Sequence, residues 1–160
     1  TDAKAKVAET LDEFRGNFAY NLLDPNARAF GAQVPIIAQW DDHEVVNNWF
    51  HDLVLERDAR YTEKRVRVLA ERAKQALFEY LPIRRHATET DRVHRSFSYG
   101  SLLEIFVIDM RSYRGANSAN VQPTASSATA LLGDTQLAWL EQSLRNSRAT
   151  WKVIASDMPL

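Results

Sequence analysis

The sequence predicts a mixed α/β fold, because segments with the patterns of strands and of helices alternate along the chain. Short apolar runs typical of strands occupy residues 34–40, 102–108 and 151–155. Apolar residues recur at helical spacing over 62–81 and 134–144. Polar side chains follow the ends of the apolar runs, and in α/β proteins functional side chains gather at the carboxyl ends of strands. We therefore expect a layered fold with its functional site at the strand ends.

The composition is that of one folded domain. The 160 residues are 45% hydrophobic and 26% charged, close to the averages of globular proteins, which excludes a fibrous or wholly disordered chain. The 20 Lys and Arg residues nearly balance the 21 Asp and Glu residues, so the net charge of -1 creates no overall field to attract nucleic acid or anionic lipid. The absence of cysteine excludes disulfides, thiolate metal sites and a cysteine nucleophile. No apolar run approaches the roughly 18 residues of a membrane span.

Two helices are predicted near the start of the chain. The first carries apolar side chains at helical spacing, namely Val7, Leu11, Phe14 and Phe18. The second begins at Asp24 and Pro25, because an Asp side chain can accept a hydrogen bond from a first-turn N–H and Pro has no N–H to leave unpaired there. Pro82 ends the long helix over 62–81.

The second half of the chain is predicted to contain a hairpin, a long loop and a helix before the final strand. Residues 97–99 and 102–108 have the pattern of two strands joined by a tight turn at Gly100. Residues 115–130 are rich in Ser, Ala, Asn and Thr without periodicity, so we expect a long surface loop. Asp134 is predicted to cap the helix that follows.

The densest group of candidate site residues follows the apolar run 34–40. Six of the next eight positions carry a carboxylate, an imidazole or an amide: Asp41, Asp42, His43, Glu44, Asn47 and Asn48. Carboxylate and amide oxygens are hard ligands that suit calcium, magnesium, manganese or ferric iron, and a single His without Cys argues against structural zinc. Acidic residues do not recur at the alternate positions of an EF-hand. The same residues could instead serve as a helix cap, a buried hydrogen-bonding His and turn residues, and the pattern alone leaves both interpretations open.

Other charged residues have structural interpretations beside functional ones. Arg111 and Arg114 follow the second hairpin strand, where a guanidinium could hold a phosphate or pair with a structural carboxylate such as Asp109. We favour structural roles for Asp109 and Arg114 and leave Arg111 open. A basic stretch contains Arg84, Arg85, His86, Arg92, His94 and Arg95. It lacks interleaved aromatic residues for base stacking, so we expect a solvated loop and no specific nucleic-acid binding.

Five segments, spread over most of the chain, match the motifs of a known family. The most specific is WDDHEVVNNW at residues 40–49, preceded by Val34-Pro35. The others are FAYNLLDPNARAF at 18–30, IFVIDMRSYR at 105–114, LLGDTQLAWLEQSL at 131–144 and WKVIASDMPL at 151–160. Together these segments resemble the PhoD-type alkaline phosphatases of the metallophosphoesterase superfamily.

The resemblance implies a fold and an activity. PhoD-type enzymes are similar to other metallophosphoesterases in having a layered β-sandwich flanked by helices. This chain, residues 1–160, would form only the central portion of one such catalytic domain. The resemblance also implies a hydrolase that acts on phosphate monoesters and diesters, with ferric iron and calcium, or other divalent cations, as cofactors. It places the parent protein in the periplasm or outside the cell.

The resemblance assigns roles to individual residues. In the superfamily a Gly-Asn-His-Glu/Asp segment supplies a metal-ligating amide and a nearby imidazole, and these positions fall on Asp42 and His43. The imidazole could donate a hydrogen bond to the phosphoryl oxygen or protonate the leaving group. Asp157 takes the place of a metal-ligating His that precedes Tyr-Pro in the similar purple acid phosphatases. The remaining candidates for substrate contact or support are Asp41, Asn47, Asn48 and Arg111.

Three further motifs of the family find no match in the chain. These are an upstream Asp motif, a Gly-Asp ligand motif and a downstream segment that bears His; Gly133-Asp134 belongs instead to LLGDTQ. We therefore expect a segment of a longer enzyme that is inactive by itself and whose unpaired strand edges allow self-association. The alternative is a non-catalytic scaffold, or a fragment that binds a cation weakly.

Overall fold

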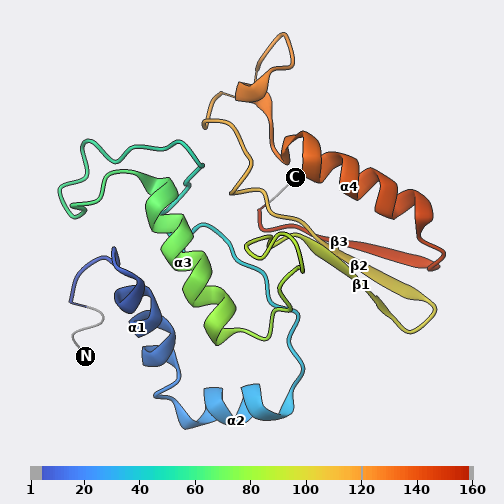
Figure 1. Cartoon of the computed structure of the whole chain (residues 1–160), viewed down its shortest axis with the longest axis horizontal. Helices are drawn as coiled ribbons and strands as arrows, with labels where there is room; N and C mark the ends of the chain where they lie inside the picture. The colour runs from blue at the N-terminus through green and yellow to red at the C-terminus, as the bar shows by residue number, and fades with distance from the viewer. Residues whose placement is uncertain (1–4, 120, 159–160) are drawn as a thin grey trace. The chain divides into compact units, whose positions relative to one another are not determined.

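The computed structural model describes residues 5–119 and 121–158 (Figure 1). The chain divides into two compact units, which we name the N-terminal and C-terminal units. The N-terminal unit contains the chain up to Ala38 with Glu44–Asn47 and Asp52–Asp91, and the C-terminal unit contains Gln39–His43, Asn48–His51 and the chain from Arg92 onward. Helices together with one sheet confirm the predicted mixed α/β class. The single domain remains a prediction.

In the N-terminal unit, helix α1 (Leu11–Asn21) packs against helix α3 (Val66–Tyr80), as Figure 1 shows. Phe14 of α1 is buried, and Phe18 stacks on Tyr80 with ring centroids 5.3 Å apart. Burial of Phe14 and the stacking of Phe18 on Tyr80 stabilise the helix pair. Both helices lie where apolar residues recur at helical spacing, as the sequence predicts.

Polar caps fix where the first two helices begin. Thr10 Oγ1 accepts a hydrogen bond from Glu13 N–H at 3.3 Å, and Glu13 Oε2 accepts one from Thr10 N–H at 2.9 Å. This capping box starts α1 after Thr10 and not at Val7. Helix α2 (Pro25–Gln33) begins as predicted, with a first-turn N–H that donates to Asp24 Oδ1 at 2.8 Å. In the described part of the chain, no helix has the length and apolar character needed to cross a membrane.

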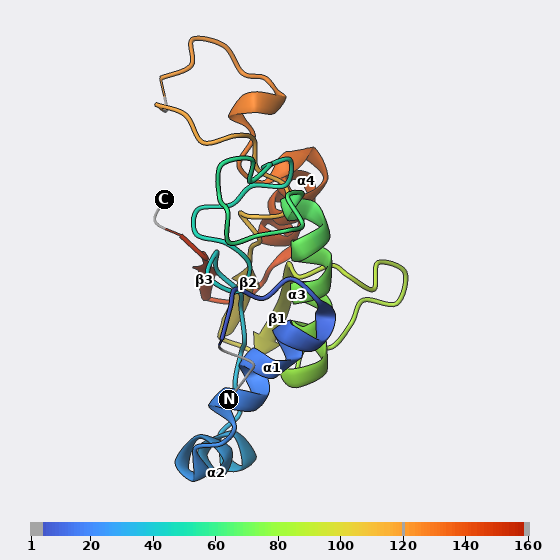
Figure 2. The same ribbon diagram turned by 90° about the vertical axis from the view of Figure 1, so that its left-hand side faces the viewer.

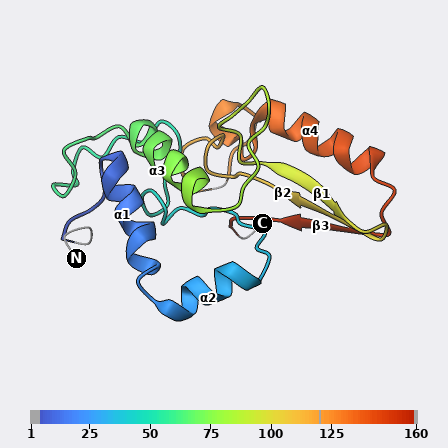
Figure 3. The same ribbon diagram turned by 60° about the horizontal axis from the view of Figure 1, so that its bottom comes forward.

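The C-terminal unit contains the sheet. Strands β1 (Arg95–Tyr99) and β2 (Leu103–Val107) form the predicted antiparallel hairpin, and β3 (Trp151–Ala155) pairs with β2 in parallel. Gly100 turns the chain with a φ of 65°, a left-handed conformation that glycine adopts at little cost. Figure 3 shows the strands side by side in the order β1-β2-β3. Because β2 and β3 are parallel, the polar residues that follow them lie at the same end of the sheet, where both strands finish.

The predicted strand over residues 34–40 is wrong. The sheet in the described part of the chain has three strands, and this segment is not among them. Pro35 has no N–H to contribute to a ladder of backbone hydrogen bonds. Gln39 instead reaches the sheet through its side chain, since its Nε2 donates to the carbonyls of Ile108 at 2.7 Å and Ala155 at 3.2 Å.

Helix α4 (Gly133–Asn146) covers one face of the sheet, as Figures 1 and 3 show. The buried core between them contains Phe106, Ile108, Met110 and Leu140. The helix is the predicted one, but Asp134 is not its N-cap. The helix begins at Gly133 with Leu132 as its N-cap, so Asp134 lies in the first turn, where its negative charge interacts favourably with the helix dipole.

The side-chain amide of Gln136 ties α4 to the chain that leaves β2. Gln136 is fully buried; its Oε1 accepts a hydrogen bond from Asp109 N–H at 2.8 Å, and its Nε2 donates to the carbonyls of Asp109 at 2.8 Å and Leu132 at 3.0 Å. One side chain therefore satisfies both backbone groups of a buried residue, and water is excluded from these bonds. The path of the chain after β2 depends on this amide.

Residues 115–119 and 121–132 belong to the long loop that the sequence predicts, drawn in orange in Figure 2. It contains one 3-10 turn, η2 (Ser127–Thr129). At its base, Gly115 N–H donates to the Ala130 carbonyl at 2.8 Å and brings the two ends of the loop together. A Cβ on Gly115 would lie 2.6 Å from the Ala128 carbonyl oxygen, so no other residue fits there without a backbone shift.

We predict that Gln136→Ala lowers the free energy of unfolding by about 3 kcal/mol, because it leaves the buried N–H and C=O of Asp109 without partners. Urea unfolding followed by tryptophan fluorescence measures this, since all four tryptophans belong to the C-terminal unit. The control, Gln142→Ala at an exposed position of α4, should change stability by less than about 0.5 kcal/mol. Equal stability of the two variants would contradict the role of the Gln136 amide.

Candidate functional site

The candidate site is built on the turn over residues 41–48, which two tryptophans enclose. Trp40 and Trp49 are 1% and 0% exposed and meet edge to face, with ring centroids 5.3 Å apart. Burying two large rings against each other stabilises the turn and brings its two ends together. Asp41, Asp42 and His43 lie directly after the first of these rings, and Asn48 lies directly before the second.

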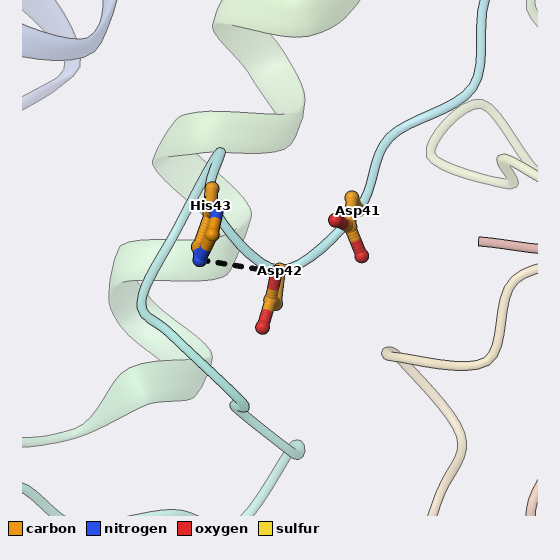
Figure 4. Close-up of side chains that lie close together, drawn as sticks. All are labelled: Asp41, Asp42 and His43. Carbon is orange, nitrogen blue, oxygen red and sulfur yellow. Dashed lines mark ion pairs between the residues drawn. The ribbon is translucent and has the colours of Figure 1, made fainter. Parts of the chain in front are cut away.

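Three consecutive side chains of this turn form an acidic cluster, which we define as Asp41, Asp42 and His43. Their possible ligand atoms lie within 4.8 Å of one another. Figure 4 shows the three side chains, with a dashed line between His43 Nε2 and Asp42 Oδ1, which are 3.7 Å apart. The Asp42 side chain is 6% exposed, whereas those of Asp41 and His43 are 51% and 72% exposed. Two carboxylates and an imidazole are a donor set that a hard cation accepts.

The neighbours of Asp42 favour its ionised form. Asn48 N–H donates to Asp42 Oδ2 at 2.6 Å, and Arg111 Nη2 lies 3.5 Å from the same oxygen. Burial by itself would raise the pKa of Asp42, but the Asn48 N–H and the charges of Arg111 and His43 outweigh burial and lower it. A carboxylate that is buried and still ionised at neutral pH is suited to hold a cation.

Arg111 supplies positive charge to both aspartates of the cluster. Its side chain is 4% exposed, and its Nη2 lies 3.4 Å from Asp41 Oδ1 and 3.5 Å from Asp42 Oδ2. The turn after β2 directs this side chain, because Asp109 Oδ1 accepts hydrogen bonds from the N–H groups of Arg111 at 3.0 Å and Ser112 at 2.9 Å. Nε and Nη1 of Arg111 find no hydrogen-bond acceptor in the described chain. The geometry is that of a buried counter-charge to the cluster.

Asp157, the second metal ligand suggested by the sequence, is not a member of the acidic cluster. Both of its carboxylate oxygens accept from Met110 N–H, at 3.1 Å each. Burial, and then the negative charge of Asp109, raises the pKa of Asp157 from its ordinary 3.8 to about 6, although the charge of Arg111 acts in the opposite direction. Arg111 therefore favours the ionised form of both Asp42 and Asp157.

Asn47 and Asn48 lie in the turn itself, whereas Arg114 lies in the segment that follows β2. Asn47 and Asn48 are exposed, and Asn48 adopts a φ of 56°. Arg114 Nη1 donates to the sulfur of Met158 at 3.4 Å, so the expected carboxylate partner is replaced by a thioether.

The basic stretch is only in part the solvated loop that we expected. Three of its side chains are exposed: Arg84, Arg85 and His86. The Arg92 guanidinium instead lies 5.6 Å from the centroid of the Trp139 ring, and the His94 ring, which is 3% exposed, lies 4.9 Å from the same ring. Because these side chains pack on an aromatic residue of α4, they are not part of a solvated loop.

Sequence reasoning missed two amides that organise the surroundings of the site. Gln136 lies in the LLGDTQ motif, and that motif was the available signal, but its buried role was not inferred. Asn117 Nδ2 donates to the Asn48 carbonyl at 2.8 Å. It lies in a loop without periodicity, so no signal in the sequence pointed to it.

Three comparisons with known proteins agree. The model of the family described as PhoD-like phosphatase matches residues 1–160. The chain is 32% identical over 168 residues to alkaline phosphatase D of Bacillus subtilis (strain 168), an alignment that covers 93% of the chain and 27% of that protein. The solved structure of PhoD matches with a TM-score of 0.71 and 31% identity, over 92% of the chain and 29% of the solved chain. The chain thus spans less than a third of the length of these relatives.

We predict that Asp157→Asn raises the free energy of unfolding at a pH of about 8 by about 1 to 2 kcal/mol, after allowance for solvent screening. In the folded protein the pKa of Asp157 is about 6, whereas in the unfolded chain it is near its ordinary value of 3.8. The folded protein therefore keeps this proton to a higher pH. Ionised Asp157 therefore costs stability that accumulates as the pH rises from about 4 to about 6. An Asn carbonyl can still accept from Met110.

Urea unfolding between pH values of about 4 and about 8 tests this, with Asp52→Asn at an exposed aspartate as the control. The gain of Asp157→Asn should grow with pH, whereas the control should change stability by less than about 0.5 kcal/mol. A loss of stability in Asp157→Asn at the alkaline end would show that its ionised carboxylate stabilises the fold.

Proposed function

The chain belongs to the PhoD-like phosphatase family, and from this we propose that it is the central portion of a catalytic domain that hydrolyses phosphate monoesters and diesters with the aid of metal ions. The observation that carries the proposal is the acidic cluster, in which ligand atoms of Asp41, Asp42 and His43 lie within 4.8 Å of one another. A buried ionised carboxylate beside an exposed imidazole offers a cation ligand and a proton donor at one place.

Asp42 and Asp157 are the proposed metal ligands, with Asp41 as a neighbouring carboxylate. Ferric iron and calcium, or other divalent cations, are the proposed cofactors, because these ions prefer oxygen ligands. When bound, such cations lower the pKa of water and neutralise phosphate oxygens during displacement. The lowered pKa of Asp42 and the fixed orientation of its Oδ2 by the Asn48 N–H support its assignment.

His43 is the proposed catalytic residue. Its side chain is 72% exposed, so a phosphate ester that arrives from solvent can reach it, and Asp42 Oδ1 lies 3.7 Å from its Nε2. There the imidazole would donate a hydrogen bond to the phosphoryl oxygen or protonate the leaving alkoxide. Asp41 and the exposed amides of Asn47 and Asn48 are proposed to contact substrate or water around it.

Arg111 is proposed to support the site without contacting substrate. Its side chain is 4% exposed, which prevents a phosphate from forming a bidentate pair with it. Its charge offsets the repulsion between the adjacent carboxylates of Asp41 and Asp42. Asp42 can then remain ionised although it is buried.

By itself the chain is proposed to bind a cation weakly and to be inactive. The proposed ligands Asp42 and Asp157 leave a metal site several ligands short, since calcium takes about six to eight oxygens. The other ligands would come from the rest of the parent protein, which we propose is periplasmic or extracellular. Strand β3 is an edge of the described sheet, and we propose it as a site of self-association in the isolated chain.

We predict that Asp42→Ala in the parent protein lowers the hydrolysis of bis(p-nitrophenyl) phosphate at alkaline pH by more than about a hundredfold, because a metal ligand is lost. Metal content, measured by mass spectrometry of the purified variant, should fall with activity. Asp52→Ala, at an exposed aspartate, is the control and should retain both. Full activity and full metal content in Asp42→Ala would remove this residue from the metal site.

We predict that His43→Ala lowers turnover by about a hundredfold to ten-thousandfold, the range for loss of a general acid, and leaves most of the metal bound. His51→Ala provides a matched control at an exposed histidine. Loss of all metal from His43→Ala would instead place the imidazole among the metal ligands.

A further inference from the structure

One side chain of the long loop contacts the turn that carries the candidate site. Asn117 Nδ2 donates to the Asn48 carbonyl at 2.8 Å, across 69 positions of the sequence. Two residues earlier, Gly115 N–H donates to the Ala130 carbonyl at 2.8 Å and closes the base of the loop. Asn117 therefore lies two residues from the closed base of a loop that has little regular structure.

Asn48 connects this loop contact to Asp42. Its carbonyl accepts from Asn117, and its N–H donates to Asp42 Oδ2 at 2.6 Å. Its φ of 56° lies in the left-handed region, which Asn tolerates better than most residues but which remains unfavourable without support. The two hydrogen bonds lie on opposite sides of the Asn48 Cα, so together they fix both peptide planes and aim the N–H at the carboxylate.

The orientation of the Asp42 carboxylate follows from this contact. Oδ2 is occupied by the Asn48 N–H and lies 3.5 Å from Arg111, whereas Oδ1 faces His43 at 3.7 Å. If the Asn48 peptide could rotate, the carboxylate would lose its short charge-assisted hydrogen bond and with it the distinction between its two oxygens.

We infer that Asn117 is a positioning residue that acts on Asp42 through the backbone of Asn48. Loop and turn are then one functional unit, in which a loop amide determines which carboxylate oxygen is presented at the acidic cluster. The consequence for cation binding rests on the proposed function, whereas the consequence for the Asn48 N–H does not. This difference allows the two to be tested apart.

The test compares Asn117→Ala with Gln122→Ala in the same chain. Gln122 is a matched control, because it is an exposed amide of the same loop whose Nε2 donates to Ser118 Oγ within the loop. The first measurement is hydrogen exchange of the Asn48 amide by NMR. Loss of one supporting hydrogen bond should speed this exchange about fivefold in Asn117→Ala and leave it unchanged in Gln122→Ala.

The second measurement is the affinity for terbium, a hard cation whose emission is sensitised by Trp40 beside the acidic cluster. Asn117→Ala should weaken terbium binding about fivefold, Gln122→Ala should not, and Asp42→Asn identifies the signal that belongs to this carboxylate. Unchanged exchange of the Asn48 amide in Asn117→Ala overturns the inference. The inference is also overturned if Asn117→Ala exchanges the Asn48 amide faster but leaves the Asp42-dependent terbium affinity unchanged. If the wild-type chain gives no signal that depends on Asp42, faster exchange upholds the positioning and the proposed cation site is what fails.

Discussion

The buried Gln136 amide bonds both the N–H and the C=O of Asp109, and the geometry at the carboxyl end of β2 depends on this constraint. It fixes the direction in which the chain leaves β2. Asp109 Oδ1 then holds the next turn, and that turn sends the Arg111 guanidinium to Asp41 and Asp42. A neutral amide on α4 therefore supports the segment that carries Arg111, because it satisfies both backbone groups of a buried residue.

The pKa values of two carboxylates in this region shift in opposite directions. Asp42 and Asp157 both lose hydration, yet the pKa of Asp42 is lowered and that of Asp157 is raised to about 6. At Asp42 the Asn48 N–H and the charges of Arg111 and His43 outweigh burial. At Asp157 burial, together with the negative charge of Asp109, outweighs the Met110 N–H and the charge of Arg111. Carboxylates whose pKa values are shifted in opposite directions are found at sites that bind cations or move protons.

Local patterns predicted most helices and the strands of the sheet, but they failed where a side-chain hydrogen bond decides the conformation. Residues 34–40 have the apolar character of a strand, yet Gln39 meets the sheet through its side chain and not through its backbone. The first helix starts after Thr10 because of a capping box. Such contacts depend on a hydrogen-bond partner that hydrophobic periodicity does not describe.

The sequence by itself determined the family, the mixed α/β class and the cluster of hard ligands, because these depend on residue types at short spacings within WDDHEVVNNW and the segments that resemble the family. Only the tertiary structure decided which of these groups act together. It united Asp41, Asp42 and His43 with Arg111, kept Asp157 out of the acidic cluster, and joined the turn to Asn117. Spacing along a chain fixes which groups are neighbours in one turn, whereas packing brings together groups 69 residues apart and sets their burial and charge.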